Sequence, residues 1–312
     1  MLILISLLLV APYLLPVVNQ EIPANYLPYP ESRFIEIENV RFHYRQWSSE
    51  TESSKGNVFL IHGFSASTFC WRNNISALTR EGYNVVAVDV PPFGFSDREA
   101  DMNHSTTNRS RLLWLLTDSL KKEKWIIIGH SMGGGIATVM AATHPEKTEK
   151  LILIDGVTLS TKKTKTSITQ YILRFQPIHR WAEVLGKTFF YKDKKFEELL
   201  TSAYAQKPDS TAIAGYKQPF MYKGLASGIF KTSAYSNEIT DVDMSTLNSI
   251  PTLIFWGEKD TWVPLSSGKA YKKAHPHAML EIIEEAGHCP METHYEIFNQ
   301  KMLDFLNSKE KN

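Results

Sequence analysis

The sequence predicts an α/β protein with a doubly wound, mostly parallel sheet of eight strands and a helical cap inserted after the sixth strand. From residue 30 onward, short runs of apolar and β-branched residues alternate with longer segments of helical periodicity. Most of these runs are continuously apolar, as in strands that helices cover on both faces. Such alternation predicts parallel strands joined by right-handed crossovers.

The expected strands can be placed in order along the chain. The first two, 33–38 and 41–46, alternate apolar and polar residues like an antiparallel pair with one face in water. The other six are expected at 57–61, 84–88, 125–128, 151–154, 252–255 and 279–283. The clearest helical patterns lie at 110–120, 132–142 and 292–306.

The alternation stops between residues 156 and 250, where no convincing buried strand can be found in the sequence. Apolar residues recur there at helical spacing instead: Ile168, Ile172 and Phe175, then Phe196, Leu199, Leu200 and Ala203. A helical insertion between two strands of one sheet is expected to lie as a cap over the carboxyl ends of the strands. The predicted division is therefore a core at 33–156 and 251–312 and a cap at 157–250.

The first 20 residues carry no charged side chain. Residues 2–18 are almost entirely apolar and are interrupted by Ser6, Pro12 and Pro16. Their length falls between the apolar core of a secretion signal, roughly 7–15 residues, and a spanning helix of about 20. We therefore expect residues 1–20 to be a signal or membrane anchor and residues 21–32 to be a spacer. The expected location is membrane-associated or secreted rather than cytoplasmic.

Charge and composition exclude several classes of function. The chain has 34 Lys and Arg against 33 Asp and Glu, so nothing in its net charge of +1 favours nucleic acid as a partner. Its two cysteines, Cys70 and Cys289, cannot make a disulfide scaffold, and we expect two free buried thiols. No metal-ligand spacing, phosphate-binding glycine loop or dinucleotide fingerprint occurs, so neither a metal nor a cofactor is expected.

The strongest functional signal is Gly129-His130-Ser131-Met132-Gly133, between an expected strand and an expected helix. In that context G-x-S-x-G predicts a nucleophile elbow, a tight turn that presents the serine hydroxyl at the end of the strand. Glycines are needed because a Cβ would not fit close to the strained serine backbone. We predict that Ser131 is a nucleophile.

A serine hydroxyl needs a base to take its proton, and the base needs an acid to orient it. His288 follows the last expected strand, and Asp260 follows the strand before it. The chain order Ser131, Asp260, His288 is one in which such triads occur. Asp155, which follows the strand at 151–154, is the alternative acid, and Asp89 is interpreted as a residue that fixes a loop.

An oxyanion hole is predicted from His62-Gly63-Phe64, which follows the strand at 57–61. The backbone N–H groups of Phe64 and Met132 are expected to converge on the oxygen that becomes negative during acyl transfer. His62 itself is interpreted as structural, bonded to the loop backbone.

Together these motifs resemble the α/β-hydrolase fold family, in its capped, esterase- and lipase-like branch. The resemblance covers residues 33–307 and rests on His62-Gly63-Phe64, on 89–96, on 129–134, on 257–260 and on Gly287-His288. Two positions depart from the family pattern: Pro92 stands where Gly is usual, and Ser65 where Pro or Gly is common. Both departures affect loops rather than the triad. Ser131 excludes the branches whose nucleophile is an aspartate.

The resemblance implies a serine hydrolase that cleaves carboxylic esters with an apolar acyl part, its substrate being a small-molecule ester or a lipid. Ser131 would attack, His288 would move the proton, and Asp260 would hold the imidazolium until water resolves the acyl-enzyme. The same triad under a similar cap is also used to hydrolyse a C–C bond in diketones of the meta-cleavage type. A hydrolase fold that only binds ligands is the third alternative.

Overall fold

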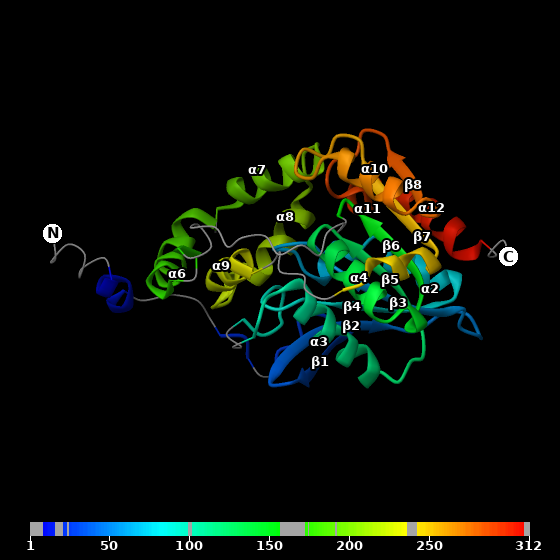
Figure 1. The fold of residues 1–312 in the computed structure, drawn as a ribbon. Coiled ribbons are helices and arrows are strands. Elements are labelled where there is room, and N and C mark those ends of the chain that lie inside the picture. Colours follow the sequence, from blue (N-terminus) through cyan, green and yellow to red (C-terminus); the bar gives the residue numbers. More distant parts are fainter. Residues whose placement is uncertain are drawn as a thin grey trace.

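The computed structural model describes residues 9–15, 21–23, 25–98, 102–156, 172–173, 175–190, 192–235 and 242–308. Its centre is a sheet of eight strands in the order β1-β2-β4-β3-β5-β6-β7-β8 (Figure 1). The strands from β4 to β8 pair in parallel, whereas β1 and β2 are antiparallel at one edge. This confirms the predicted fold class.

Each strand overlaps the segment that the sequence predicts for it. They are β1 (Ser32–Ile37), β2 (Val40–Trp47), β3 (Gly56–Ile61), β4 (Tyr83–Val88), β5 (Trp125–His130), β6 (Thr148–Ile154), β7 (Thr252–Gly257) and β8 (Met279–Ile283). The first strand ends one residue earlier than predicted, because Glu38 and Asn39 take positive φ values of 49° and 62° in the hairpin turn. In the central strands β5 and β7 every residue is buried, as their continuous apolar runs predict.

Helices cover both faces of the sheet. The core helices are α2 (Ile75–Glu81), α3 (Thr106–Ser119), α4 (Met132–Thr143), α10 (Leu265–Ala274), α11 (Pro290–Thr293) and α12 (Tyr295–Asn307). Side chains of α3, α4 and α10 bury one face, and those of α2, α11 and α12 bury the other. Helix α3 begins four residues before the predicted start, because the Ser105 hydroxyl caps it by accepting from the Asn108 N–H. The helix predicted at 292–306 is divided at His294, which has φ −126° and ψ 38°.

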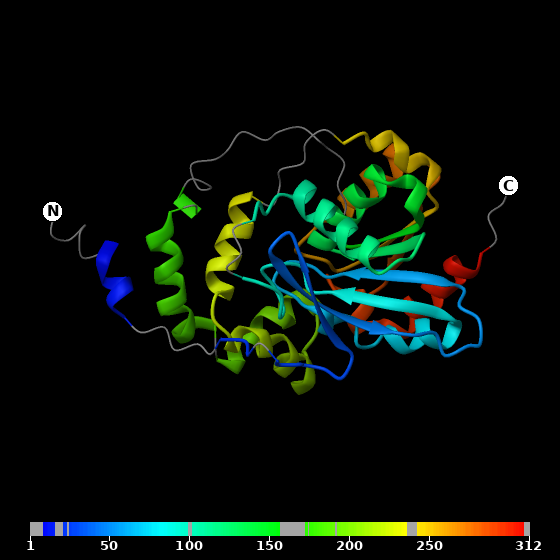
Figure 2. The ribbon, with the colours of Figure 1, turned by 90° about the horizontal axis from the view of Figure 1, so that it is seen from below.

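Within the described residues between β6 and β7 lie the helices α6 (Gln176–Phe190), α7 (Asp193–Tyr204), α8 (Ser210–Lys217) and α9 (Leu225–Tyr235). Figures 1 and 2 show them gathered at one end of the sheet, away from the C-terminus, as the predicted cap requires. In α7, Phe196, Leu200 and Ala203 are buried, whereas Leu199 is 49% exposed because the buried stripe is narrower than the apolar pattern. Ile168 lies outside the described residues.

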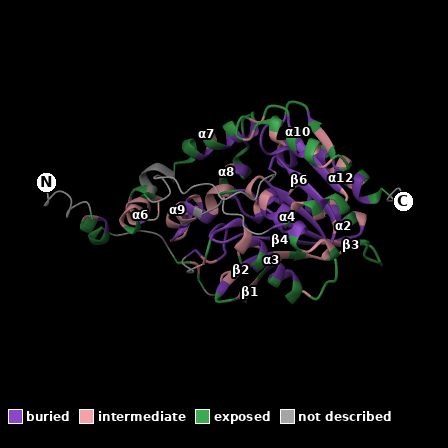
Figure 3. Ribbon diagram, in the orientation of Figure 1, coloured by how far each residue is buried: buried purple, intermediate pink, exposed green. Residues whose placement is uncertain are grey.

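Burial is concentrated in the sheet and in α4, while the outer surface of α7 is exposed (Figure 3). The buried side chain of Arg98, after β4, joins core and cap, because its guanidinium donates to the carbonyl oxygens of Pro219 and Tyr222 at 2.8 Å each. The buried Lys150 of β6 joins the sheet to the end of α12, because it donates to the carbonyl oxygens of Phe305, Leu306 and Ser308, at 3.0, 2.8 and 3.2 Å.

The described part of the N-terminal segment touches the cap. Residues 9–14 are helical, and Arg180 of α6 donates to the carbonyl oxygens of Pro12 and Leu15 at 3.0 Å each. No helix among the described residues has the length and apolar character needed to cross a bilayer. Residues 1–8 and 16–20 of the predicted segment lie outside the described residues. Within the predicted spacer, Tyr26 and Tyr29 pack against Phe95, with ring centroids 5.9 and 6.1 Å apart.

Candidate active site

The turn between β5 and α4 is as tight as the elbow motif predicts. Ser131 sits between the strand and the helix with φ 53° and ψ −118°, and its N–H donates to the Ile154 carbonyl at 2.8 Å. A Cβ on Gly129 would lie 2.2 Å from the Gly133 carbonyl oxygen, so the crossing of strand and helix requires glycine there. The turn leaves the Ser131 side chain partly exposed at the end of the sheet.

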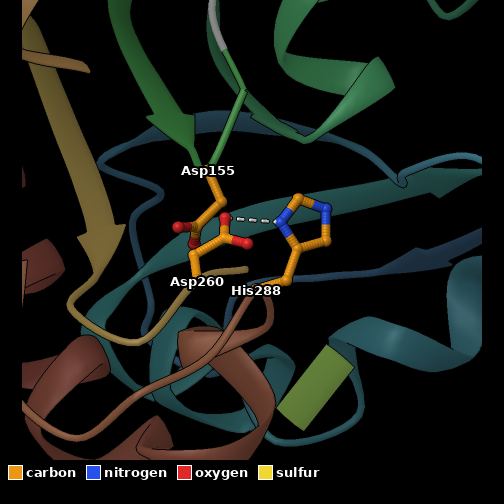
Figure 4. Close-up of side chains that lie close together, drawn as sticks. All are labelled: Asp155, Asp260 and His288. Atoms are coloured by element: carbon orange, nitrogen blue, oxygen red, sulfur yellow. Dashed lines mark hydrogen bonds and ion pairs between the residues drawn. The ribbon is translucent and has the colours of Figure 1, made fainter. Parts of the chain in front are cut away.

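The structure brings Ser131, His288 and Asp260 together. His288 Nε2 lies 2.8 Å from Ser131 Oγ, and His288 Nδ1 lies 2.7 Å from Asp260 Oδ2. Figure 4 shows the imidazole facing the Asp260 carboxylate. Because a carboxylate only accepts, Nδ1 carries the hydrogen, and the lone pair of Nε2 faces the serine hydroxyl.

Asp260 is held as a carboxylate by its surroundings. Burial alone would raise its pKa, but the hydrogen bond and charge of His288 and two backbone N–H groups lower that pKa below its ordinary value. The two N–H groups belong to Trp262 and Val263, which donate to Oδ1 at 2.7 and 3.0 Å. The site therefore keeps a fixed negative charge on the far side of the imidazole from the serine.

Asp155, the alternative acid, is close to this set but does not bond to His288. Its Oδ1 accepts from the Gly257 N–H at 2.8 Å, and its side chain is fully buried. Asp155, Asp260 and His288 offer oxygen or nitrogen atoms within 4.8 Å of one another, a spacing that could also suit a metal ion. His288 Nδ1 and Asp260 Oδ2 are already joined by a hydrogen bond. The expectation of a metal-free site stays a prediction.

The loop that carries His288 is fixed by the elbow and by the cap. The His288 carbonyl accepts from Nε2–H of His130 at 2.7 Å, and burial lowers the pKa of His130 to about 3, so this ring is neutral. The His288 N–H donates to the Ala203 carbonyl at 2.6 Å, in the last turn of α7. The Trp262 ring stacks on the His288 ring with centroids 5.3 Å apart, and its Nε1–H donates to Ser202 at 3.0 Å.

A buried carboxylate, Glu292 of α11, ties the same loop to two cap helices. It accepts from the Tyr204 hydroxyl of α7 at 2.8 Å and from the Tyr216 hydroxyl of α8 at 2.5 Å, and it pairs with Arg72. Sequence reasoning found neither this contact nor the roles of His130 and Trp262. The one available signal was position, since each lies within four residues of a predicted triad member. The two cysteines are free and buried, as expected.

On the other side of Ser131 lies the loop after β3. His62 is buried, its Nε2 accepts from the Val90 N–H at 2.9 Å, and its Nδ1–H therefore donates to the Gly63 carbonyl at 2.7 Å. This confirms that His62 bonds the loop backbone. Because C=O and N–H point to opposite sides of a trans peptide, holding the Gly63 carbonyl turns the Phe64 N–H the other way.

The two predicted oxyanion donors keep their N–H groups available. Within the part of the chain that the structure describes, neither the Phe64 N–H nor the Met132 N–H donates to another residue. Met132 is the first residue of α4, where the N–H has no acceptor inside the helix. The convergence of these two groups on a substrate oxygen stays a prediction.

Elsewhere in the core, Ser32, His43 and Asp89 form a second Ser–His–Asp set, and every member of it is buried. Ser32 Oγ is 2.8 Å from His43 Nε2, and His43 Nδ1 is 2.7 Å from Asp89 Oδ2. Asp89 also accepts from the backbone N–H groups of Thr68 and Phe95, at 2.6 and 2.8 Å. Asp89 thus fixes the loops around it, as the sequence predicts.

The fold, the elbow and the relay from serine to histidine to aspartate define a hydrolase. The sequence pattern of the alpha/beta hydrolase fold family matches residues 56–295, and the chain belongs to that family.

Similar proteins narrow the class only in part. A 2-hydroxy-6-oxononadienedioate/2-hydroxy-6-oxononatrienedioate hydrolase of Cupriavidus pinatubonensis is 26% identical over 283 residues, which cover 88% of this chain and 95% of that protein. Among solved structures, a membrane phospholipase A has a TM-score of 0.67 at 23% identity, covering 88% of this chain and 85% of the other. A meta-cleavage product hydrolase of Pseudomonas fluorescens also has a TM-score of 0.67, at 22% identity and with 88% and 97% covered. The fold alone therefore does not distinguish the bond that is cleaved.

Proposed function

We propose that this protein is a serine hydrolase in which Ser131 attacks a carbonyl carbon, His288 moves the proton and Asp260 holds the imidazolium. The observation that supports it is the unbroken relay, with 2.8 Å from Ser131 Oγ to His288 Nε2 and 2.7 Å from His288 Nδ1 to Asp260. On attack, the serine proton passes to Nε2, and the neighbouring carboxylate stabilises the charge that forms on the ring.

The negative charge that develops on the substrate oxygen would be stabilised by the Phe64 and Met132 N–H groups. The amino end of α4 adds a favourable dipole at the same place. The tetrahedral intermediate formed by attack then collapses: the bond to the leaving group breaks, His288 gives its proton to that group, and an acyl group stays on Ser131. His288 then activates a water molecule that hydrolyses this acyl-enzyme.

For the substrate, we propose a diketone of the meta-cleavage type, cleaved at the C–C bond next to a ketone. The relative of Cupriavidus pinatubonensis supports this proposal, because its name states hydrolysis of such a compound and the alignment covers 88% of this chain. The leaving group is then a carbon whose charge is delocalised into a conjugated system, and His288 returns the proton to it. The acyl-enzyme has the same form as one made from an ester, so the same triad serves both reactions.

An ester with an apolar acyl part is the second candidate. Phe64 and Trp262 flank the predicted catalytic groups and are 42% and 45% exposed, which gives an apolar acyl chain a surface to pack on. The absence of charged side chains from residues 1–20 also favours a substrate found near lipid.

Two measurements on the purified full-length chain test these proposals. A fluorophosphonate should label the protein at Ser131, and the Ser131→Ala variant should not be labelled; an unlabelled native protein would instead indicate a fold that only binds ligands. Turnover of a 2-hydroxy-6-oxo-dienoate is then compared with a series of p-nitrophenyl esters of increasing acyl length. A higher kcat/KM for the dienoate supports C–C hydrolysis, and a higher value for esters supports the second candidate.

We also propose that residues 1–20 attach the protein to a membrane or direct its secretion. The support is their lack of charge and the exposure of Leu14, which is 78% accessible. A chain that begins at Asn25 keeps the packed Tyr26 and Tyr29. It should be recovered in the supernatant with unchanged kcat on a short ester, whereas the full chain should fractionate with membranes. Aggregation of the shorter chain, or a changed kcat, would contradict this proposal.

A further inference from the structure

Asp155 sits directly behind the predicted catalytic acid. It is the first residue after β6, its φ is 46°, and its N–H donates to the Phe255 carbonyl of β7 at 3.0 Å. This backbone turns the side chain under the end of β7, where Oδ1 accepts from the Gly257 N–H. Asp155 is thereby held in one orientation.

The second oxygen of Asp155 has no hydrogen-bond donor. Among the described residues no N–H or O–H group reaches Oδ2, although the side chain is fully buried. Figure 4 shows the carboxylates of Asp155 and Asp260 next to each other, with His288 on the other side of Asp260. A buried carboxylate oxygen directed at a second carboxylate would be strongly unfavourable if both groups were ionised.

Of the two, Asp260 is the one that stays ionised. It accepts three hydrogen bonds, from His288, Trp262 and Val263, whereas Asp155 accepts one. His288 is the other titratable group close to Asp155, within 4.8 Å, and its Nδ1–H is directed at Asp260 instead. Burial raises the pKa of the Cys289 thiol, which therefore stays uncharged. Burial and then the charge of Asp260 raise the pKa of Asp155 well above its usual range.

We propose that Asp155 is a positioning residue for the triad: a neutral carboxylic acid whose Oδ2–H donates a hydrogen bond to the Asp260 carboxylate. The effect of Asp155 on catalysis rests on the proposed function, whereas its being protonated does not depend on that function. The hydrogen bond keeps the Asp260 side chain directed at His288 and withdraws negative charge from it. The proton stays on Asp155 throughout, and no covalent bond forms or breaks at this residue.

The Asp155→Asn variant tests the protonation state through the pH profile. Its amide keeps the acceptor for Gly257 and offers an N–H donor to Asp260, so a neutral Asp155 is replaced by a neutral donor. On a short p-nitrophenyl ester we expect kcat within about threefold of the native value and an acid limb of kcat/KM moved by less than about 0.3 pH unit. If Asp155 were ionised, the same change would remove a negative charge near His288 and move this limb about one unit or more to lower pH. That result would overturn the proposal.

The Asp155→Ala variant removes the donor and tests positioning. Without it, Asp260 carries more negative charge and His288 binds its proton more tightly, so the acid limb should move to higher pH. Since a hydrogen bond to a charged group is worth about tenfold, kcat should fall by about that factor with little change in KM. An unchanged acid limb and kcat would overturn the positioning role. If Asp155→Ala does not fold, the proposal is tested by the pH profile, the infrared spectrum and the unfolding stability of Asp155→Asn.

Two readouts do not depend on turnover. The infrared band of a protonated carboxylic acid should be present at pH 7 in the native protein and in Asp260→Asn, but lost in Asp155→Asn.

The second readout is stability. A group whose pKa is raised on folding contributes stability below its unfolded pKa, about 3.9, and that contribution is lost as the pH rises. Asp155→Asn should therefore be more stable than the native protein at pH 7. A band that survives in Asp155→Asn, or no gain in stability, would overturn the proposal, even if Ser131→Ala showed that the proposed function is wrong.

Discussion

Ser131, His288 and Asp260 are joined by hydrogen bonds of 2.8 and 2.7 Å, and Ser32, His43 and Asp89 are joined by bonds of the same two lengths. The two carboxylates are also alike, because each accepts from two backbone N–H groups besides its histidine. Bond lengths within the triad therefore do not separate a reactive set from a structural one.

The difference lies around the serine. Ser131 is partly exposed in a strained turn, next to an unbonded N–H at the start of a helix. Ser32 is buried at the start of β1, and its hydroxyl also accepts from the Tyr29 N–H at 3.1 Å. A substrate carbonyl can approach the first hydroxyl and has no route to the second. Access and the two available N–H groups, rather than the relay itself, set the proposed catalytic triad apart from the buried one.

The largest expected effect comes from removing the two serines in turn. Ser131→Ala should lower kcat by a factor on the order of 10⁴ or more, because the triad members act as a unit. Fluorophosphonate labelling followed by peptide mapping should find Ser131 alone. The matched variant Ser32→Ala should keep kcat within a few-fold and lose about 1–3 kcal/mol of unfolding free energy, since the Tyr29 N–H and His43 lose a buried partner. Substantial turnover in Ser131→Ala would contradict the distinction between a catalytic Ser131 and a structural Ser32.

The two aspartates should separate activity from stability. Asp260→Asn is expected to lower kcat on the order of 10⁴-fold by favouring the wrong imidazole tautomer, while the protein stays folded. Asp89→Asn should lower kcat by less than about tenfold but cost about 3 kcal/mol in denaturant unfolding, because the new –NH2 group would face a buried N–H donor whichever oxygen it replaces.

The pH dependence of unfolding sharpens this contrast. Burial raises the pKa of Asp89, but the charge and hydrogen bond of His43 outweigh it and lower the pKa below the ordinary value. A carboxyl group of this kind stabilises the fold above its unfolded pKa of about 3.9, and that contribution is lost as the pH falls further. Asp89→Asn should therefore lose less stability than the native protein between pH 5 and pH 2. An acid-unfolding curve of unchanged shape would contradict this role.

The smallest expected effect concerns the rings around each histidine. His43 is enclosed by Tyr29, Phe34 and Phe95, whereas His288 stacks on Trp262, a residue tied to the cap through Ser202. Trp262→Ala should lower kcat by up to about tenfold, the worth of an aromatic contact that orients the imidazole. Trp262→Phe keeps the stacking and should retain most of the activity. Equal losses in both variants would show that the hydrogen bond to Ser202, rather than the ring contact, orients His288.

Sequence reasoning could bring Ser131, His288 and Asp260 together because each follows a parallel strand, and the carboxyl ends of parallel strands meet at one edge of a sheet. It could not find the buried set. Ser32 and His43 meet diagonally across the β1–β2 hairpin, where Phe34 is the residue paired with His43. That contact depends on the register of the hairpin, which is set by the turn at Glu38 and Asn39, and no local sequence motif predicts the contact.

The contacts between the cap and the loops that carry the triad could not be predicted from the sequence either. Helical spacing predicts that α7 has a buried face, but it does not say which loop of the core that face meets. The contacts of Ala203 with His288 and of Tyr204 with Glu292 follow from how the cap docks on the core. Docking depends on the packing of whole helices, so these residues became visible only in the structure.

The position of Lys150 has a consequence for the order in which the chain can mature. Its buried ammonium group, on the sixth of the eight strands along the chain, donates to the carbonyl oxygens of Phe305, Leu306 and Ser308. During synthesis the chain emerges from its N-terminus, so β6 leaves the ribosome more than 150 residues before those acceptors do. Until they arrive, these three hydrogen bonds cannot contribute to burying the ammonium group. We therefore expect α12 to pack stably on its face of the sheet only after residue 308 has been synthesised, so that this part of the core forms late.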